Sequence, residues 1–178
     1  MDSEPWFRKR AGIVEHWPSY VMLAIMCYIA FVVYQAHLAE VENNRELECL
    51  SGLKQISISM FMYCEDYDSH FPPGNKWNIV DPRMRKYPMA CPDTNAKLPT
   101  DALNSSMHDL RHIADPGNTV CVFESKPGEN LCGGPELLPS APRHSGGDHI
   151  GFADGHVKWV MRSDIGKYKW NPGQAGKP

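Results

Sequence analysis

The sequence predicts an α+β protein with a long N-terminal helix packed on a small antiparallel β-sheet, and two stretches carry most of this prediction. Residues 19–37 are apolar without any Asp, Glu, Lys or Arg, and no proline follows them until Pro72. Near the other end, apolar and polar residues alternate around Asp154-Gly155, which is typical of a β-hairpin. With 15 prolines and 14 glycines in 178 residues, we expect the remainder to be rich in loops.

The apolar stretch is long enough to cross a membrane. As a helix, residues 19–37 would extend ~28 Å, about the thickness of a hydrocarbon core. Basic residues at 8–10 precede it and acidic residues at 40, 42, 46 and 48 follow it, so the positive-inside rule places the N-terminus in the cytoplasm. We therefore expect residues 1–17 to be a cytoplasmic segment, 18–38 a transmembrane helix of the bacterial inner membrane, and 39–178 a periplasmic domain.

A cleaved signal peptide is the alternative reading of this stretch. The apolar run exceeds a usual signal core and no small-x-small cleavage site follows it, so we expect a retained anchor. At the exported end of the span, we expect His37 to be an interfacial histidine. The alternative is that His37 contacts a pigment or haem held by a partner.

The helix is expected to continue from about Pro18 to Tyr67, where the segment HFPPG ends it. Apolar residues recur there at three- and four-residue spacing, which gives one apolar stripe: Leu50, Leu53, Ile56, Met60, Cys64 and Tyr67. Further along, residues 118–125 are rich in β-formers and predict a strand. Residues 102–112 suggest a short helix.

A hairpin with Asp154 and Gly155 as its two turn residues has a defined register. That register places four apolar residues on one face, which we expect to pack against the long helix. The four are Phe152 opposite Val157 and Ile150 opposite Trp159. The polar residues of the segment would lie on the exposed face and in the turn.

The histidines of this segment raise the question of a metal site. In this register His149 and His156 share a face but lie four positions apart, ~13 Å, which is too far for one metal ion. The sequence also lacks the spacing of known catalytic motifs. We therefore expect no catalytic residue, no metal and no cofactor.

Several segments together resemble the type IV pilin-like proteins, or pseudopilins, that end in an H-X9-DG motif. His144 and Asp154-Gly155 meet that motif with nine residues between them, and Cys49 begins a Cys-x-x-x-Leu-Lys-Gln segment. Residues 87–92 match a Tyr-x-x-x-Cys-Pro segment, and a strand follows at 119–124. The resemblance implies a long N-terminal helix on a small antiparallel sheet and no catalytic activity. It also suggests His144 as a structural latch opposite the Asp-Gly turn.

The prepilin processing site is not matched in its usual form. The nearest string runs from Gly12 to Glu15, with the glutamate too close to the glycine, and Pro18 follows where a pilin helix runs unbroken. We therefore expect the chain to keep its N-terminus and to act outside a pilus.

Five cysteines follow the span, and an exported domain permits disulfides. On one helix Cys49 and Cys64 would lie ~22 Å apart, so they cannot pair with each other. We expect Cys91 to bridge one of these two, and a bridge between Cys121 and Cys132 is a further alternative. No CxxC pair of the kind found in thiol redox enzymes is present.

The charge balance excludes one class of partner. With 18 Lys and Arg against 21 Asp and Glu, nothing indicates nucleic acid. The sequence predicts a non-enzymatic single-pass subunit that contacts the lipid bilayer and other integral membrane subunits with their periplasmic domains. It would hold together a secretion, respiratory or photosynthetic complex. The alternatives are a processed pseudopilin of a type II secretion or type IV pilus-like filament, and a periplasmic metal-dependent enzyme.

Overall fold

The structure is a computed structural model that describes residues 17–85, 90–92, 94 and 96–173. The expected cytoplasmic segment up to residue 16 and Tyr87 of the Tyr-x-x-x-Cys-Pro segment lie outside the described residues. The chain divides into two compact units, Met1–Asn43 and Asn44–Pro178. One helix, α2 (Trp17–Asp66), has residues in both.

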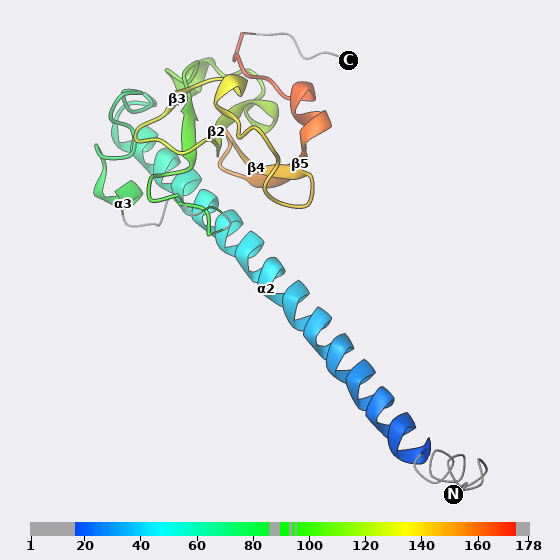
Figure 1. Cartoon of the computed structure of the whole chain (residues 1–178). Coiled ribbons are helices and arrows are strands. Elements are labelled where there is room, and N and C mark those ends of the chain that lie inside the picture. The colour runs from blue at the N-terminus through cyan, green and yellow to red at the C-terminus, as the bar shows by residue number, and fades with distance from the viewer. Residues whose placement is uncertain (1–16, 86–89, 93, 95, 174–178) are drawn as a thin grey trace, which may run out of the picture. The chain divides into compact units, whose positions relative to one another are not determined.

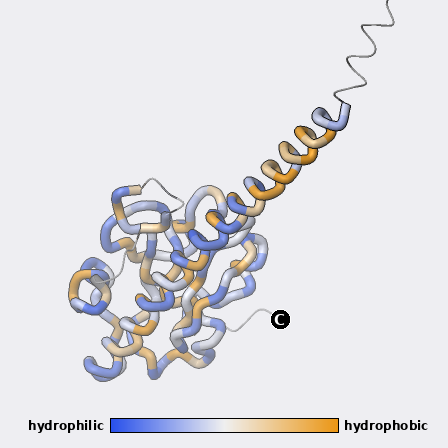
Figure 2. The backbone as a smooth tube through the Cα atoms, turned by 90° about the horizontal axis from the view of Figure 1, so that it is seen from below, coloured by the Kyte–Doolittle hydropathy of each residue, from blue (hydrophilic) through white to orange (hydrophobic). Residues whose placement is uncertain are grey.

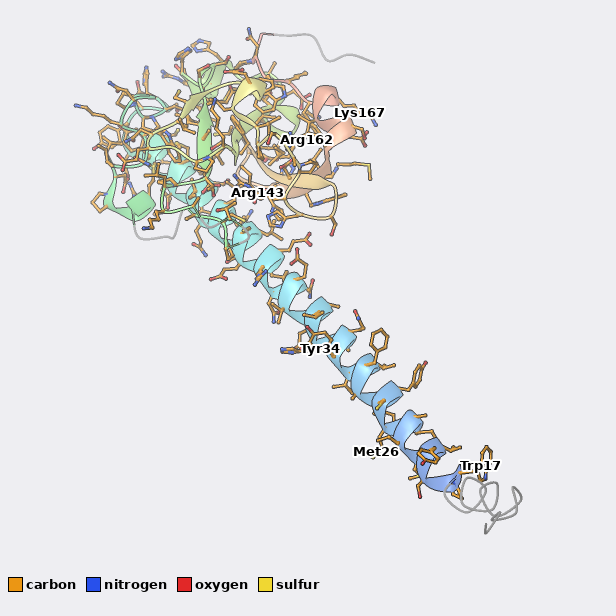
Figure 3. The ribbon with its side chains drawn as sticks, in the orientation of Figure 1. Trp17, Met26, Tyr34, Arg143, Arg162 and Lys167 are labelled. Carbon is orange, nitrogen blue, oxygen red and sulfur yellow. The ribbon has the colours of Figure 1, made fainter. Side chains whose placement is uncertain are left out.

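In the first unit, the helix exposes apolar side chains all around. Every residue from 17 to 40 is exposed, and the labelled side chains of Trp17, Met26 and Tyr34 project from the ribbon (Figure 3). Figure 2 shows the high hydropathy of this part of the helix. Among the described residues, α2 is the one helix that is long and apolar enough to cross a membrane, by length and composition.

In the second unit, the remainder of α2 has one buried face. Leu53, Ile56 and Met60 are almost fully buried, at the three- and four-residue spacing that the sequence predicts. The helix ends at Asp66, and Asp68 and Ser69 then adopt positive φ angles of 50° and 64°. This left-handed turn allows the amide of Ser69 to bond the carbonyl of Cys64 at 2.7 Å, which satisfies a carbonyl at the helix end.

A mixed five-stranded sheet completes the expected α+β fold (Figure 1). Its order is β3 (Cys132–Gly133), β1 (Asp101–Asn104), β2 (Val120–Glu124), β4 (Gly147–Phe152) and β5 (Val157–Met161). All neighbouring pairs are antiparallel except β1 with β3, which is parallel. The predicted strand at 118–125 is β2. A short helix, α3 (Pro82–Arg85), lies between α2 and the sheet in the chain order.

Residues 102–112 do not form the short helix that the sequence suggested. They hold most of β1 and a single 3-10 turn, Leu110–His112. The whole of β1 is buried, and its pairing with both β2 and β3 outweighs the local helical preference.

The sheet is covered on both faces, which the alternating pattern did not reveal. One apolar cluster joins the buried face of α2 to Leu103, Val122 and Ala153. A second cluster includes Phe123, Ile150 and other residues, and the C-terminal segment with Tyr168 and Trp170 packs against it. Both faces of β4 are therefore buried, its polar residues included.

The register of the hairpin differs by one residue from the predicted one. Gly151 pairs with Val157, and His149 pairs with Trp159. The connection is a longer loop, closed by a bond of 2.9 Å from the amide of Phe152 to the carbonyl of His156. A one-residue shift gives each residue a different cross-strand partner and places the side chains of one strand on the other face of the sheet. The predicted placement of polar residues on an exposed face is therefore wrong for His149, which is 1% exposed.

The apolar face of β4 also points away from α2, contrary to the prediction. Ile150 and Phe152 belong to the second cluster, on the far side of the sheet. The residue that faces the helix is Gly151, where a Cβ atom would lie 2.5 Å from the hydroxyl of Ser57. A glycine here lets helix and strand approach closely.

Candidate functional site

Four chemically reactive side chains from four separate segments meet inside the second unit. They are Cys49 on α2, Cys91 in the segment after α3, Glu124 at the end of β2, and His144 just before β4. One sulfur, nitrogen or oxygen atom from each lies within 4.8 Å of the others. We refer to these four residues as the Cys–His–Glu cluster.

The centre of the cluster is the Nε2 atom of His144. It lies 3.6 Å from the sulfur of Cys91 and 2.9 Å from Oε1 of Glu124. The sulfurs of Cys49 and Cys91 are 2.7 Å apart. His144 and Glu124 are at most 1% exposed, whereas Cys49 is half-buried.

Residues around the cluster hold its members in place. The backbone amide of His149 donates to Oε2 of Glu124 at 2.9 Å, and its ring nitrogen Nδ1 lies 3.3 Å from Oε1. The amide of Cys91 donates to the hydroxyl of Thr100 at 2.8 Å. The sequence predicts Trp159 on the face of the hairpin that packs against the long helix. In the structure its Nε1 donates to the carbonyl of His144 at 2.7 Å.

The electrostatics of the cluster favour an ion pair. Burial alone would lower the pKa of His144, but hydrogen bonds with Cys91 and Glu124 outweigh it and raise this pKa to about 10. Burial would likewise raise the pKa of Glu124, yet hydrogen bonds from His144 and His149 lower it to about 2. Imidazolium and carboxylate therefore stabilise each other in a buried site.

A second buried carboxylic acid, Asp101, lies close by but is not charged in the same way. Burial, followed by the negative charge of Glu124, raises the pKa of Asp101 well above its usual range. Asp101 pairs with Glu124 across β1 and β2, which explains why two buried carboxylates do not both ionise.

A small cavity of about 70 Å³ opens beside the cluster. Cys49, Cys91, Glu124 and Asp101 all line it. The cavity gives an ion or a water molecule a route to the two sulfurs and the carboxylate.

The geometry does not fit a nucleophilic triad. In such a triad the acid holds one ring nitrogen while the other nitrogen takes the proton of the nucleophile. Here Cys91 and Glu124 both contact Nε2 of His144, so the two nitrogens do not divide these roles. The donors instead converge on one point, an arrangement that can hold a metal ion.

The other motif residues lie in the hairpin loop. Asp154 accepts hydrogen bonds from the amide of His156 at 3.0 Å and contacts its ring Nδ1 at 2.6 Å. Gly155 has a φ of 85°, which favours glycine, and its carbonyl accepts a bond of 2.8 Å from Nζ of Lys54. His144 contacts the cluster and Trp159, and its role as a latch against Asp154-Gly155 stays a prediction.

The arrangement of the cysteines agrees with the sequence prediction only in part. Of the two partners expected for Cys91, Cys49 is the one beside it. Cys64, Cys121 and Cys132 are free cysteines in the described part of the chain. The alternative bridge between Cys121 and Cys132 is not formed, because β1 lies between their strands and separates them by roughly 9.5 Å.

The free thiols of Cys64 and Cys121 are buried and weakly acidic. Burial, with a smaller effect of Asp109, raises the pKa of Cys64 to about 12. Burial also raises the pKa of Cys121. Both thiols are therefore protonated and unreactive at neutral pH.

Comparisons with family models, curated proteins and solved structures found no match to this chain. Sequence reasoning missed the role of Glu124 and its contact with His144. A partial signal existed, since Cys49, Cys91 and His144 each belong to one of the motifs that the sequence itself singles out. Their meeting could not be read from spacing, because 42 residues separate the two cysteines.

Proposed function

We propose that this protein is a non-enzymatic, single-pass subunit of a bacterial inner-membrane complex, with a cytoplasmic N-terminus and a pilin-like periplasmic domain that holds other subunits together. The observation that carries the proposal is the exposure of every residue from 17 to 40 on an apolar helix. Such a surface needs lipid or other apolar helices around it.

The exported part of α2 offers a surface for partner subunits. Ile58, Phe61 and Met62 are about 40% exposed (41%, 39% and 42%), and Phe61 and Met62 lie three and four residues after Ile58, so all three share one side of the helix. They form an apolar row on the side of the helix away from its buried face. Apolar and aromatic groups of this kind are enriched at protein–protein interfaces.

Copurification from native membranes tests this proposal. The full chain with a C-terminal tag is extracted in mild detergent, and we expect a stable set of integral membrane proteins to remain with it. An Ile58→Glu and Phe61→Glu double variant should lose part of that set. Leu98→Glu serves as the matched control, because Leu98 is equally exposed, at 43%, but lies outside α2.

The intact mass of the protein from native membranes separates a structural subunit from a processed pseudopilin. A retained N-terminus supports the structural subunit. Loss of about a dozen N-terminal residues, together with recovery in a filament fraction, would sink it in favour of the pseudopilin.

A further inference from the structure

We propose that the Cys–His–Glu cluster is a structural metal site that binds one Zn²⁺ ion through Cys49, Cys91, Glu124 and His144. This inference is independent of the proposed membrane role, since it concerns only how the exported domain is held together. It also departs from the sequence prediction of no metal, which considered only the histidines near the hairpin.

The donor set matches the chemistry of zinc. Two thiolates, one imidazole nitrogen and one carboxylate oxygen are ligand types that Zn²⁺ takes in tetrahedral sites. Thiolate ligands disfavour Mg²⁺ and Ca²⁺, which prefer oxygen. Four protein ligands fill the tetrahedron, so the site would be structural, with no open position for catalysis.

The ligand atoms lie close to the spacing that one Zn²⁺ ion requires, and small shifts would complete it. Around one Zn²⁺, neighbouring ligand atoms lie ~3.3 to 3.8 Å apart. The sulfur of Cys91 is 3.6 Å from Nε2 of His144, and that nitrogen is 2.9 Å from the oxygen of Glu124. The two sulfurs, 2.7 Å apart, must separate by about one ångström, and the 2.9 Å contact between His144 and Glu124 must lengthen by about half of that. The cavity beside Cys49 provides room for that movement.

Neighbouring groups already orient the ligands. His149 holds the carboxylate of Glu124 through its backbone amide, at 2.9 Å. The hydroxyl of Thr100 accepts a hydrogen bond from the amide of Cys91, and the indole N–H of Trp159 donates one to the carbonyl of His144. Metal sites depend on such supporting hydrogen bonds, which fix the direction of each ligand.

Charge also favours a cation at this point. Two cysteines that bind zinc do so as thiolates and release their protons, as does the imidazole. A dication then lies among three anionic ligands in a buried position, close to the buried Asp101. The dication attracts all three anionic ligands strongly in a medium of low dielectric constant.

A disulfide between Cys49 and Cys91 is the competing use of the same sulfurs. It would leave Glu124 and His144 as a plain ion pair and would remove both sulfur ligands. The two states exclude each other, so one experiment distinguishes them.

The test measures zinc on the full chain in detergent, reduced with a phosphine and then incubated with ZnCl₂. After removal of free metal, we expect about one zinc ion per chain. Cys49→Ser and His144→Gln should each lose it, whereas Cys132→Ser should keep it. Cys132 is the matched control, because it is half-buried like Cys49 and lies outside the cluster.

Cobalt gives a second measurement that needs no variant. Co²⁺ bound to the reduced wild-type chain should show a thiolate charge-transfer band that stoichiometric Zn²⁺ abolishes. No zinc on the reduced wild type, or zinc retained by both ligand variants, would overturn the proposal. A Cys49–Cys91 disulfide in peptides from native membranes, in a chain that binds no zinc once reduced, would assign the sulfurs to a bridge instead.

Discussion

The indole nitrogen of Trp159 donates a hydrogen bond of 2.7 Å to the backbone carbonyl of His144. The same ring lies over Gly147, where a Cβ atom would approach it to 2.5 Å. Strand β5 thereby fixes the segment that carries the histidine of the cluster. Trp159 is thus a positioning residue, which acts on the cluster through the backbone.

Removal of that hydrogen bond should loosen the cluster. We expect Trp159→Phe to lower the free energy of unfolding by about 0.5–1.5 kcal/mol, because the buried carbonyl of His144 loses one of its two donors and keeps the amide of Gly147. The ring of Trp170 also packs in the core, yet its Nε1 has no partner among the described residues. Denaturant titration should therefore show a smaller loss for Trp170→Phe. Equal losses would contradict the role given to the Trp159 bond.

The close approach of α2 and β4 should tolerate no side chain at Gly151. A Cβ atom there would lie 2.5 Å from the Ser57 hydroxyl and 2.7 Å from Cγ2 of Val122. We expect Gly151→Ala to cost about 1–3 kcal/mol in the free energy of unfolding, as overpacked cores do. Gly166→Ala is the control, since a Cβ atom there meets nothing within 4 Å. A Gly151→Ala chain as stable as the control would show that the helix does not pack on this strand.

The buried ion pair of Asp148 with Arg162 should make stability depend on pH. Asp148 is fully buried, and Arg162 bonds its carboxylate at 2.7 Å and the carbonyl of Pro139 at 2.7 Å (Figure 3 labels Arg162). We expect Arg162→Met to cost about 3–5 kcal/mol at neutral pH, because it leaves the carboxylate without its cation. Lys167→Met should cost little, since its ion pair with Asp164 is exposed.

The direction of the pH effect follows from the pKa of Asp148. Burial raises this pKa more than Arg162 lowers it, so the folded state favours the protonated acid. The contribution of Asp148 to stability should therefore fall as the pH rises from below ~3.9, the value for an unfolded chain, through the folded pKa. In Arg162→Met the pKa rises further, so the difference from wild type should widen from pH 4 to pH 7. A difference that does not change with pH would contradict the assignment.

Metal removal should weaken the domain that contains the Cys–His–Glu cluster. A ligand that binds only the folded state at a hundred times its dissociation constant stabilises by about 2.7 kcal/mol. A chelator should therefore lower the melting temperature of the reduced, zinc-loaded chain by several degrees, and added zinc should restore it. The Cys49→Ser variant should melt at one temperature with or without chelator. A chelator effect of equal size in that variant would place the stabilising metal elsewhere.

The flanking charges predict the topology in the membrane. Alkaline phosphatase, which is active only in the periplasm, should be active when fused after residue 178 and inactive when fused after residue 16. A charge-reversed chain, with residues 8–10 changed to Glu, should lose much of this difference. Activity of the second fusion and inactivity of the first would reverse the expected orientation.

The long helix and the central strand could be predicted from sequence because their signals are local and strong. The helix expected from Pro18 to Tyr67 is α2, Trp17–Asp66, and the strand expected at 118–125 is β2, Val120–Glu124. Helical spacing and runs of β-formers report burial on one face of an element, and neither depends on distant residues.

The hairpin register failed for a physical reason. Asp154 and Gly155 fit a two-residue turn, but the carboxylate of Asp154 bonds the amide of His156 and makes a wider loop. That loop shifts the pairing by one residue and buries His149 beside Glu124. The local turn preference could not reveal this. The second apolar cluster and the carboxylate of Glu124 favour the shifted register, and both involve residues far from the hairpin in the sequence.

The cluster itself lay beyond prediction because its members come from four segments. No residue spacing predicts that Cys49 on the helix reaches Cys91 or that Glu124 ends its strand beside His144. Only the packing of α2 and the pairing of β2 with β4 create the site.

The place of Trp159 on the last strand has a consequence for biosynthesis. A chain that emerges from its N-terminal end displays Cys49 and Cys91 well before the segment of His144 and its supporting indole have been made. During that interval both thiols are open to oxidation and to mispairing with other thiols. Completion of the final hairpin is therefore the step that holds His144 beside Cys91, and a chain interrupted before β5 would lack this support.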